Sequence, residues 1–235
     1  MSSSRPSPPD VGLVLVAAGT GARIGGEPKQ FRPIGGVPML LRALRPFTAH
    51  PEVGFVVVVL PTEQATHPPK WLVEVAGDRL RLVSGGAERT DSVLAGLDAL
   101  PRECTTVLVH DAARPFPSDA TISSVIAIAR RGAGAVAAIP VSDTLKRARE
   151  RDGEVEVEET VSRAGLWRAQ TPQGFPRALL QEAHAHREER APTDDAQLVE
   201  RLGARIVLVP DTPRNFKVTT TEDLELADAA ARTER

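Results

Sequence analysis

The sequence has few features of a disulfide-bonded, membrane-spanning or polyanion-binding protein. Its 235 residues include one cysteine, Cys104, which excludes a disulfide scaffold and is consistent with a reducing compartment such as the cytoplasm. No apolar run is long enough to cross a bilayer, and the polar start MSSSRPSPPD lacks the hydrophobic core of a secretory signal. Because the net charge is −2, we do not expect a general nucleic-acid or membrane-surface binder.

Two common catalytic devices are also missing from the sequence. No Ser–His–acid or Cys–His spacing stands out, so no nucleophile and base of the protein are indicated. The Gly-Lys-Ser/Thr of a P-loop is absent, and Ile24 stands where a dinucleotide-binding fingerprint has glycine or alanine. A reaction is then easiest if the substrate brings an ionised nucleophile, as a phosphate monoester does.

The most informative stretch is VGLVLVAAGTGARIGGEPKQF, residues 11–31. Val11–Val16 is an apolar run without alternation, which predicts a strand buried on both faces. Small residues and then Arg23 and Lys29 follow it, so a phosphate can be held by backbone N–H groups and nearby cations. The alternative is that the glycines serve only a tight turn.

Buried strands alternate with amphipathic helices along most of the chain, which predicts right-handed crossovers and a mainly parallel sheet. Strands are expected at 11–16, 54–60, 80–83, 105–109, 133–139 and 204–209, with a return to the sheet at 166–170. Helices are expected at 37–47, 64–76, 88–100, 176–189 and 222–232, and after caps at Ser118, Thr193 and Thr221. We therefore expect one Rossmann-like three-layer α/β domain at 11–235, after a disordered tail at 1–10.

The alternation breaks at residues 141–164, which are charged and nearly devoid of large apolar residues. Asp152-Gly153 is a hairpin turn signal, and 154–161 alternates as a strand does, so we expect a hairpin of about ten residues per strand. An isolated hairpin is marginal in water, and an identical hairpin of a second subunit would stabilise it. A mobile surface loop is the alternative.

Cationic and small residues recur where strands end, at the edge of the sheet that binds ligands in open α/β folds. After Arg23 and Lys29, the clusters are Gly85, Gly86, Arg89 and Ser92; His110, Asp111 and Arg114; and Lys217. Together they indicate an anionic ligand, and they suit holding a phosphate dianion in line with a nucleoside triphosphate. Taken singly, each residue also has a purely structural explanation. Asp111 and Arg114 would form a surface ion pair, His110 would lie in the core or at its rim, and His184 and His186 would be exposed to solvent.

Six motifs, in order, resemble those of one enzyme family. They are Ala17-Ala18-Gly19 through Arg23 to Pro28-Lys29-Gln30-Phe31, Gly85-Gly86-x-x-Arg89-x-x-Ser92-Val93, His110-Asp111-Ala112-Ala113-Arg114-Pro115, Asp143-Thr144-Leu145-Lys146-Arg147, Arg163-x-Gly165-Leu166-Trp167-x-x-Gln170-Thr171-Pro172-Gln173, and Asn215-x-Lys217-Val218-Thr219. Over residues 11–231 the chain resembles the 2-C-methyl-D-erythritol 4-phosphate cytidylyltransferase family.

The resemblance implies a nucleotide-diphospho-sugar transferase fold and transfer of CMP from CTP to methylerythritol phosphate, with release of pyrophosphate, in the non-mevalonate isoprenoid pathway. It implies Mg²⁺ carried mainly by the CTP phosphates, with no protein ligand assigned. It also implies a homodimer whose arms exchange, so that Thr144 and Arg163 reach the partner's site.

The resemblance further implies a role for each matched residue. Arg23 and Lys29 would stabilise the α-phosphate, while Arg163 and Lys217 would grip and aim the sugar phosphate. The CTP-binding positions would be Ala17, Ala18, Gly19, Gly21, Gly85, Gly86, Arg89 and Ser92. The other substrate contacts would be Asp111, Ala112, Arg114, Thr144, Thr171 and Thr193.

The sequence departs from the family pattern at three positions. Ile24 stands where methionine is frequent, and Ala87 and Ser162 stand where acidic residues are frequent. None of these removes a charge that the mechanism needs, but Ser162 could alter how Arg163 is held. Two rival functions stay open: a ribitol 5-phosphate cytidylyltransferase, and a catalytically silent nucleotide-binding protein.

Overall fold

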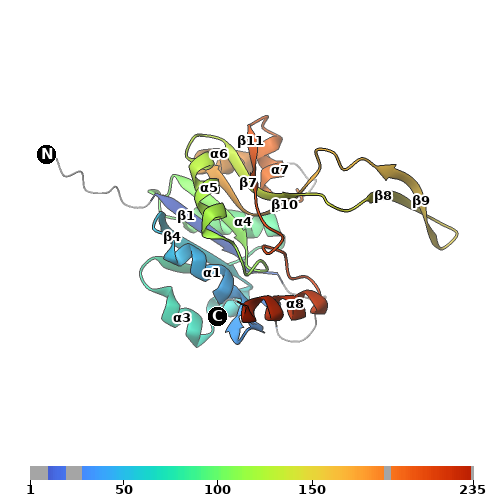
Figure 1. Cartoon of the computed structure of the whole chain (residues 1–235). Coiled ribbons are helices and arrows are strands. Elements are labelled where there is room, and N and C mark those ends of the chain that lie inside the picture. Colours follow the sequence, from blue (N-terminus) through green and yellow to red (C-terminus); the bar gives the residue numbers. More distant parts are fainter. Residues whose placement is uncertain (1–9, 20–27, 188–191, 234–235) are drawn as a thin grey trace.

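A seven-stranded sheet runs through the middle of the molecule, with the strand order β11-β7-β10-β6-β1-β4-β5 (Figure 1). The structure, a computed structural model, describes residues 10–19, 28–187 and 192–233. The strands are β1 (Val11–Val16), β4 (Val53–Leu60), β5 (Leu80–Ser84), β6 (Thr106–Asp111), β7 (Gly134–Pro140), β10 (Trp167–Pro176) and β11 (Ile206–Pro210). All neighbours pair in parallel except β10, which is antiparallel to β6 and β7. The predicted α/β sandwich with a mainly parallel sheet is confirmed.

Helices cover both faces of the sheet, so its central strands are buried on both sides (Figure 1). The helices α1 (Met39–Ala49) and α5 (Asp119–Ala129) pack on one face, in a cluster that includes Leu13 and Leu15. On the other face, α4 (Arg89–Ala99), α6 (Arg177–Ala185) and α7 (Asp195–Glu200) pack with Val14. Successive β1 side chains thus enter opposite cores, which is why the strand carries no polar residue.

The remaining short elements lie around this sandwich. The helix α8 (Thr221–Arg232) packs against β2 (Pro33–Ile34), which pairs with β3 (Val37–Pro38) after the 3₁₀ turn η1 (Lys29–Phe31). A small third core joins Ile34, Met39 and Val218. The helices α2 (Thr62–Thr66) and α3 (Lys70–Ala76) follow β4.

The hairpin arm consists of β8 (Leu145–Arg151) and β9 (Glu154–Val161) and projects away from the sandwich (Figure 1). Its turn lies at Asp152 and Gly153, which have φ values of 53° and 82°, as the sequence signal requires. The strands have seven and eight residues rather than about ten. At the root of the arm, Val141 N–H donates to the Leu166 carbonyl, so both chain ends leave the sheet side by side.

Several predicted boundaries were wrong, each for a local reason. The cap of α7 is Asp194 rather than Thr193, since its carboxylate accepts from Gln197 N–H at 2.9 Å. The cap of α8 is Thr220 rather than Thr221, because Thr220 and Asp223 form a reciprocal capping box. The helix predicted at 64–76 was expected to be interrupted at Pro68 and Pro69, and it is two helices separated by these prolines, but the first of them starts at Thr62 rather than at residue 64. The helix predicted at 37–47 starts at Met39 because residues 37–38 pair as β3.

Candidate active site

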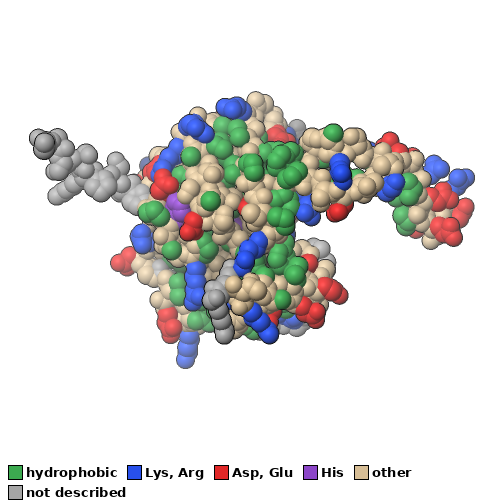
Figure 2. All heavy atoms as spheres, viewed as in Figure 1, with side chains coloured by type: hydrophobic (Ala, Val, Ile, Leu, Met, Phe, Trp, Pro, Cys, Tyr) green, Lys and Arg blue, Asp and Glu red, His purple; other side chains and the backbone are tan. Residues whose placement is uncertain are grey.

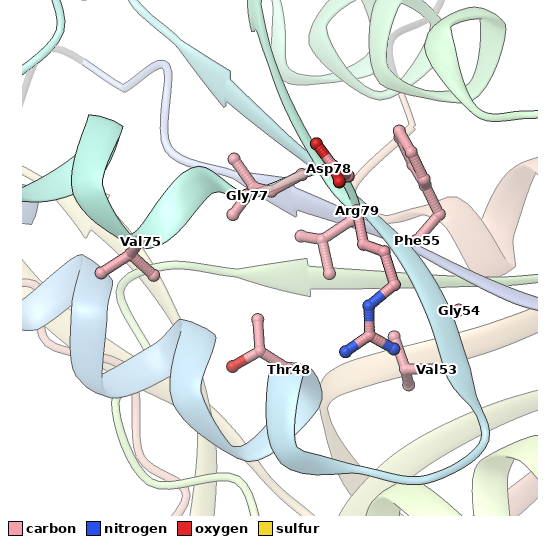
Figure 3. A pocket seen from close by; sticks show the side chains of 10 residues that line it. Thr48, Val53, Gly54, Phe55, Val75, Gly77, Asp78 and Arg79 are labelled. Carbon is pink, nitrogen blue, oxygen red and sulfur yellow. The ribbon is translucent and has the colours of Figure 1, made fainter.

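A cavity of about 380 Å³ opens at the carboxyl ends of β1 and β6, between the starts of η1 and α4. Another cavity, of about 420 Å³, lies where β4 and β5 begin, and Figure 3 shows Arg79 among the side chains around it. Because open α/β sheets bind ligands beyond the carboxyl ends of their strands, the first cavity is the candidate site. Its lining includes ten of the residues expected in the site, namely Ala17, Ala18, Gly19, Lys29, Gly86, Arg89, Ser92, Asp111, Ala112 and Lys217.

The turn after β1 forms one wall of the cavity. Ala17 N–H donates to the Val59 carbonyl at 2.8 Å, and the amide of Gln30 donates to the Ala17 carbonyl at 2.9 Å. Gln30 is buried and lines the cavity, so its amide fixes the turn, a role that the sequence motif alone does not reveal. Lys29, next to it, donates from Nζ to the Val218 carbonyl at 3.0 Å and also lines the cavity. Arg23 and Gly21 lie outside the described residues.

Gly86 lines the opposite wall, whereas its neighbour Gly85 lies outside the cavity lining. Both glycines are required by close packing. A Cβ at Gly85 would lie 2.4 Å from the Cβ of Ala18, and one at Gly86 would lie 2.3 Å from the Cβ of Asp91. Ser92 Oγ accepts from Gly86 N–H at 3.2 Å and donates to the Glu88 carbonyl at 3.1 Å. The hydroxyl therefore ties the loop to the first turn of α4.

Asp111 lies at the end of β6, between two cations. Arg89 approaches its Oδ1 through Nη2 at 3.1 Å and Nε at 3.2 Å, and Lys217 Nζ lies 2.7 Å from its Oδ2. Burial alone would raise the pKa of Asp111, but the charges of Arg89 and Lys217 outweigh burial and hold it well below its usual range. The carboxylate is therefore ionised, and it pairs with Arg89 and Lys217 rather than with Arg114, the partner that the alternative explanation gave it.

His110 and Thr171 form a buried hydrogen-bonded network with the backbone of Asp111. His110 Nε2 lies 2.9 Å from the Arg114 carbonyl, which can only accept, so Nε2 carries the proton. Burial lowers the pKa of His110 to about 4, so the ring is neutral and its Nδ1 accepts from the Thr171 hydroxyl at 2.9 Å. That hydroxyl in turn accepts from Asp111 N–H at 3.0 Å. His110 is thus a core histidine, and Thr171 is buried beneath the cavity rather than in its lining.

Asn215 holds the segment that carries Lys217. It is fully buried, and its amide donates to the Thr171 carbonyl and to Asp211 Oδ2, both at 2.7 Å. Its own carbonyl accepts from Arg114 Nη1 at 2.8 Å. Arg114 is therefore engaged with backbone, close to the site but outside the cavity lining.

Three other predicted residues lie outside the cavity lining. Thr144 and Arg163 are exposed at the root of the arm, where Arg163 donates to the Ser142 carbonyl. Thr193 is exposed just before α7, with its hydroxyl 3.4 Å from Gln197 Oε1. Within one chain, these three side chains do not complete the cavity.

The described part of the chain contains no group of three or more His, Cys, Asp or Glu side chains arranged to hold a metal ion. Nor does any described helix have the length and apolar character needed to cross a bilayer.

His184 departs from expectation, because it is buried in α6 rather than exposed. The face of α6 that carries it packs against α4 and α7, which residue spacing alone does not reveal. Burial lowers its pKa to about 4, and neither ring nitrogen has a hydrogen-bond partner in the described structure.

Residues 11–233 match the family described as IspD, 2-C-methyl-D-erythritol 4-phosphate cytidylyltransferase. The chain belongs to this family. A family member from Salinibacter ruber is 45% identical over 221 residues, which are 92% of this chain and 91% of that protein. The crystal structure of the Thermus thermophilus member, 39% identical, superposes with a TM-score of 0.77 over 93% of this chain and 98% of that one.

Some relatives carry a further part. A bifunctional enzyme IspD/IspF from Anaeromyxobacter sp. is 46% identical over 221 residues, and the match covers 92% of this chain but 56% of that protein. The chain therefore corresponds to the IspD portion of such relatives.

Proposed function

We propose that the protein transfers CMP from CTP to 2-C-methyl-D-erythritol 4-phosphate and releases pyrophosphate. The observation that carries the proposal is the family match over residues 11–233, combined with a cavity in which Lys29, Arg89 and Lys217 gather. The activity belongs to the non-mevalonate route to isoprenoid precursors, as membership of this family implies.

In the proposed reaction, a phosphate oxygen of the sugar phosphate attacks the α-phosphorus of CTP. The new P–O bond forms as the bond from the α-phosphorus to the oxygen bridging to the β-phosphate breaks, and pyrophosphate leaves with that electron pair. The attacking phosphate is already mostly dianionic at neutral pH, so no protein base has to remove a proton. Catalysis then rests on holding two anions in line and neutralising the charge that develops.

We assign these tasks to the cations of the site. Lys29 stands beside the Ala17–Gly19 turn, so it can neutralise charge on the α-phosphate held there, together with Arg23. Lys217 gives one of its three N–H groups to Asp111, and the others can bind the sugar phosphate. The Gly85–Ser92 loop would enclose cytosine and ribose against Ala17 and Ala18.

We propose that Mg²⁺ binds to the phosphates of the nucleotide rather than to a protein side chain. Asp111 is the carboxylate in the cavity that could serve as a ligand, but both of its oxygens already pair with cations. When bound to the triphosphate, Mg²⁺ would neutralise part of its charge and help pyrophosphate to leave. Glu88, the other carboxylate in the lining, takes part in the capping box at the start of α4.

We further propose a homodimer in which each arm completes the partner's site. This accounts for Thr144 and Arg163, which are exposed and lie outside the cavity lining of their own chain. It also accounts for the exposed Val155 and Val157, at 76% and 62%. Figure 2 shows hydrophobic side chains on the arm beside a group of acidic ones. We propose one cytoplasmic domain of residues 11–235, with the arm at 141–164.

The activity is tested by following pyrophosphate release from CTP with Mg²⁺ and either methylerythritol phosphate or ribitol 5-phosphate. Release with methylerythritol phosphate is expected, and it should stop when a chelator removes Mg²⁺. Release with ribitol phosphate alone would assign the other sugar. Binding of CTP without any release would indicate a silent nucleotide-binding protein.

The division of roles is tested with Lys29→Ala and Lys217→Ala, and Lys70→Ala on the exposed surface of α3 serves as control. Lys29→Ala should lower kcat by about 100-fold with a modest change in KM for the sugar phosphate. Lys217→Ala should chiefly raise that KM. Equal behaviour of the two variants would refute the assignment, and Lys70→Ala should resemble the wild type.

A further inference from the structure

Asp195 is a buried carboxylate that the proposed reaction does not use. It is the first residue of α7 and is only 1% exposed, and its Oδ2 lies 2.8 Å from Arg89 Nη1. The contact joins two groups of opposite charge, so it is a buried ion pair. Burial raises its pKa, while the charge of Arg89 opposes this. Removing a carboxylate from water is costly, so its retention here calls for a function.

The pair is the end of a longer chain of charges. Asp195, Arg89, Asp111 and Lys217 follow one another with alternating sign, at contacts of 2.8, 3.1 and 2.7 Å. The two ends of this chain differ in exposure, from 1% at the Asp195 side chain to 41% at that of Lys217 in the cavity. The chain joins α7, α4, β6 and the segment before α8, and its formal charges sum to zero.

Arg89 can bridge the two carboxylates because its guanidinium is a planar fork. Nη1 faces Asp195, while Nη2 and Nε face Asp111. The positive charge of Arg89 is therefore shared, and Asp111 is left with negative charge that attracts Lys217. Asp195 thus influences Lys217 through two intervening side chains.

We propose that Asp195 is a positioning residue that acts through Arg89 and Asp111 to hold the Lys217 ammonium at a fixed place in the cavity. The inference rests on the proposed function, since it assigns the aim of Lys217 on the sugar phosphate. With Asp195 present, Asp111 keeps a firm hold on Lys217, so the bound phosphate meets a cation of fixed position.

Loss of the Asp195 charge should change substrate binding and turnover in a defined direction. Arg89 would then direct its whole charge to Asp111, and Asp111 would hold Lys217 less firmly. The cavity would also become more positive by one charge. An anionic substrate should bind more tightly in the ground state, but Lys217 would no longer be fixed, so KM and kcat should both fall.

The test compares Asp195→Asn with Asp119→Asn, a matched control because Asp119 is the first residue of α5 and is exposed. Asp195→Asn should lower kcat about tenfold and KM for the sugar phosphate several-fold, the range for one member of a salt-bridge network. Asp119→Asn should leave both unchanged. Asp195→Glu keeps the charge and should return KM to the wild-type value. Thermal unfolding checks that each variant is folded, and Asp195→Ser replaces Asp195→Asn if the latter is not.

A merely structural role gives a different result. A lower kcat with unchanged KM, a higher KM, or unchanged kinetics in Asp195→Asn would overturn the inference. If the wild type releases no pyrophosphate, the proposed function fails on its own. Calorimetric titration with inorganic phosphate then decides the inference: tighter binding by Asp195→Asn than by the wild type supports it, and equal or weaker binding overturns it.

Discussion

Substitution of Gly85 by alanine tests whether the two walls of the cavity meet as closely as the structure indicates. The added Cβ would lie 2.4 Å from the Cβ of Ala18 and 2.7 Å from Ser92 Oγ, whereas ordinary contacts begin at 3.4 Å. The Ala18 Cβ is fixed to its backbone, so one wall has to move by about 1 Å. Ser92 cannot yield freely either, because its hydroxyl holds Gly86 and Glu88.

The expected loss of stability follows from these contacts. Overpacking of this kind costs about 1–3 kcal/mol, and a strained hydrogen bond at Ser92 adds about 1 kcal/mol. A loss of about 3 kcal/mol in unfolding free energy corresponds to a fall in Tm of about 6–12 °C for a chain of this size. Affinity for CTP should fall as well, since Gly86 and Ser92, which Gly85 contacts or adjoins, line the part of the cavity that we propose to hold the nucleotide.

Gly19→Ala is the matched control, because no described atom lies within 4 Å of the Cβ it would add. Its Tm should stay within about 2 °C of the wild-type value. Its affinity for CTP, measured by calorimetric titration, should still fall if phosphate approaches the backbone at this turn. A wild-type Tm for Gly85→Ala would refute the close packing, and wild-type CTP affinity for Gly19→Ala would refute phosphate binding at the turn.

Three further predictions concern acid stability, the support of Lys217 and the arm. A histidine whose pKa falls from 6.5 to about 4 on folding does not change stability above pH 6.5, where it is neutral in both states, but it lowers the unfolding free energy by about 2 kcal/mol at pH 5, where only the unfolded state is protonated. His184→Leu should therefore lose about 2 kcal/mol less than the wild type between pH 8 and pH 5 in urea unfolding, and equal losses would contradict this reasoning. Asn215→Ala removes two buried hydrogen bonds and should cost about 3 kcal/mol while raising KM for the sugar phosphate; an unchanged urea midpoint would speak against it. Val155→Glu with Val157→Glu should give a monomer by light scattering at micromolar concentration, whereas the exposed Val73→Glu should not; a persistent dimer would exclude the arm as the interface.

The central strands were predictable because local sequence decides them. Val11–Val16 matches β1, and the apolar run at 54–60 lies within β4, since a strand covered on both faces needs continuous apolar residues. The strand β10 was predicted only as a return at 166–170 because Gln170, Thr171 and Gln173 are polar, yet all three are buried. Their partners come from other segments, such as Asp194 for the Gln173 amide at 2.8 Å.

Which residues belong to the site was easier to predict from the sequence than which of them contact one another. Motifs at strand ends identified Asp111 and Lys217, but not that they pair across 106 positions of sequence. Sequence spacing does not reveal the role of Asp195, because its partner Arg89 lies on another helix. His184 was judged from its spacing on α6, whereas packing between helices determines its burial.

The root of the arm bears on how this fold can diversify. Both ends of the arm emerge from adjacent antiparallel strands, where Pro140 pairs with Trp167 and Val141 bonds to Leu166. The pairing of β7 with β10 is therefore complete at the root of the arm, so the register of these strands does not depend on the length of the hairpin. Insertions or deletions in the hairpin can change which surface it reaches, while the cavity at the carboxyl ends of the strands keeps its geometry.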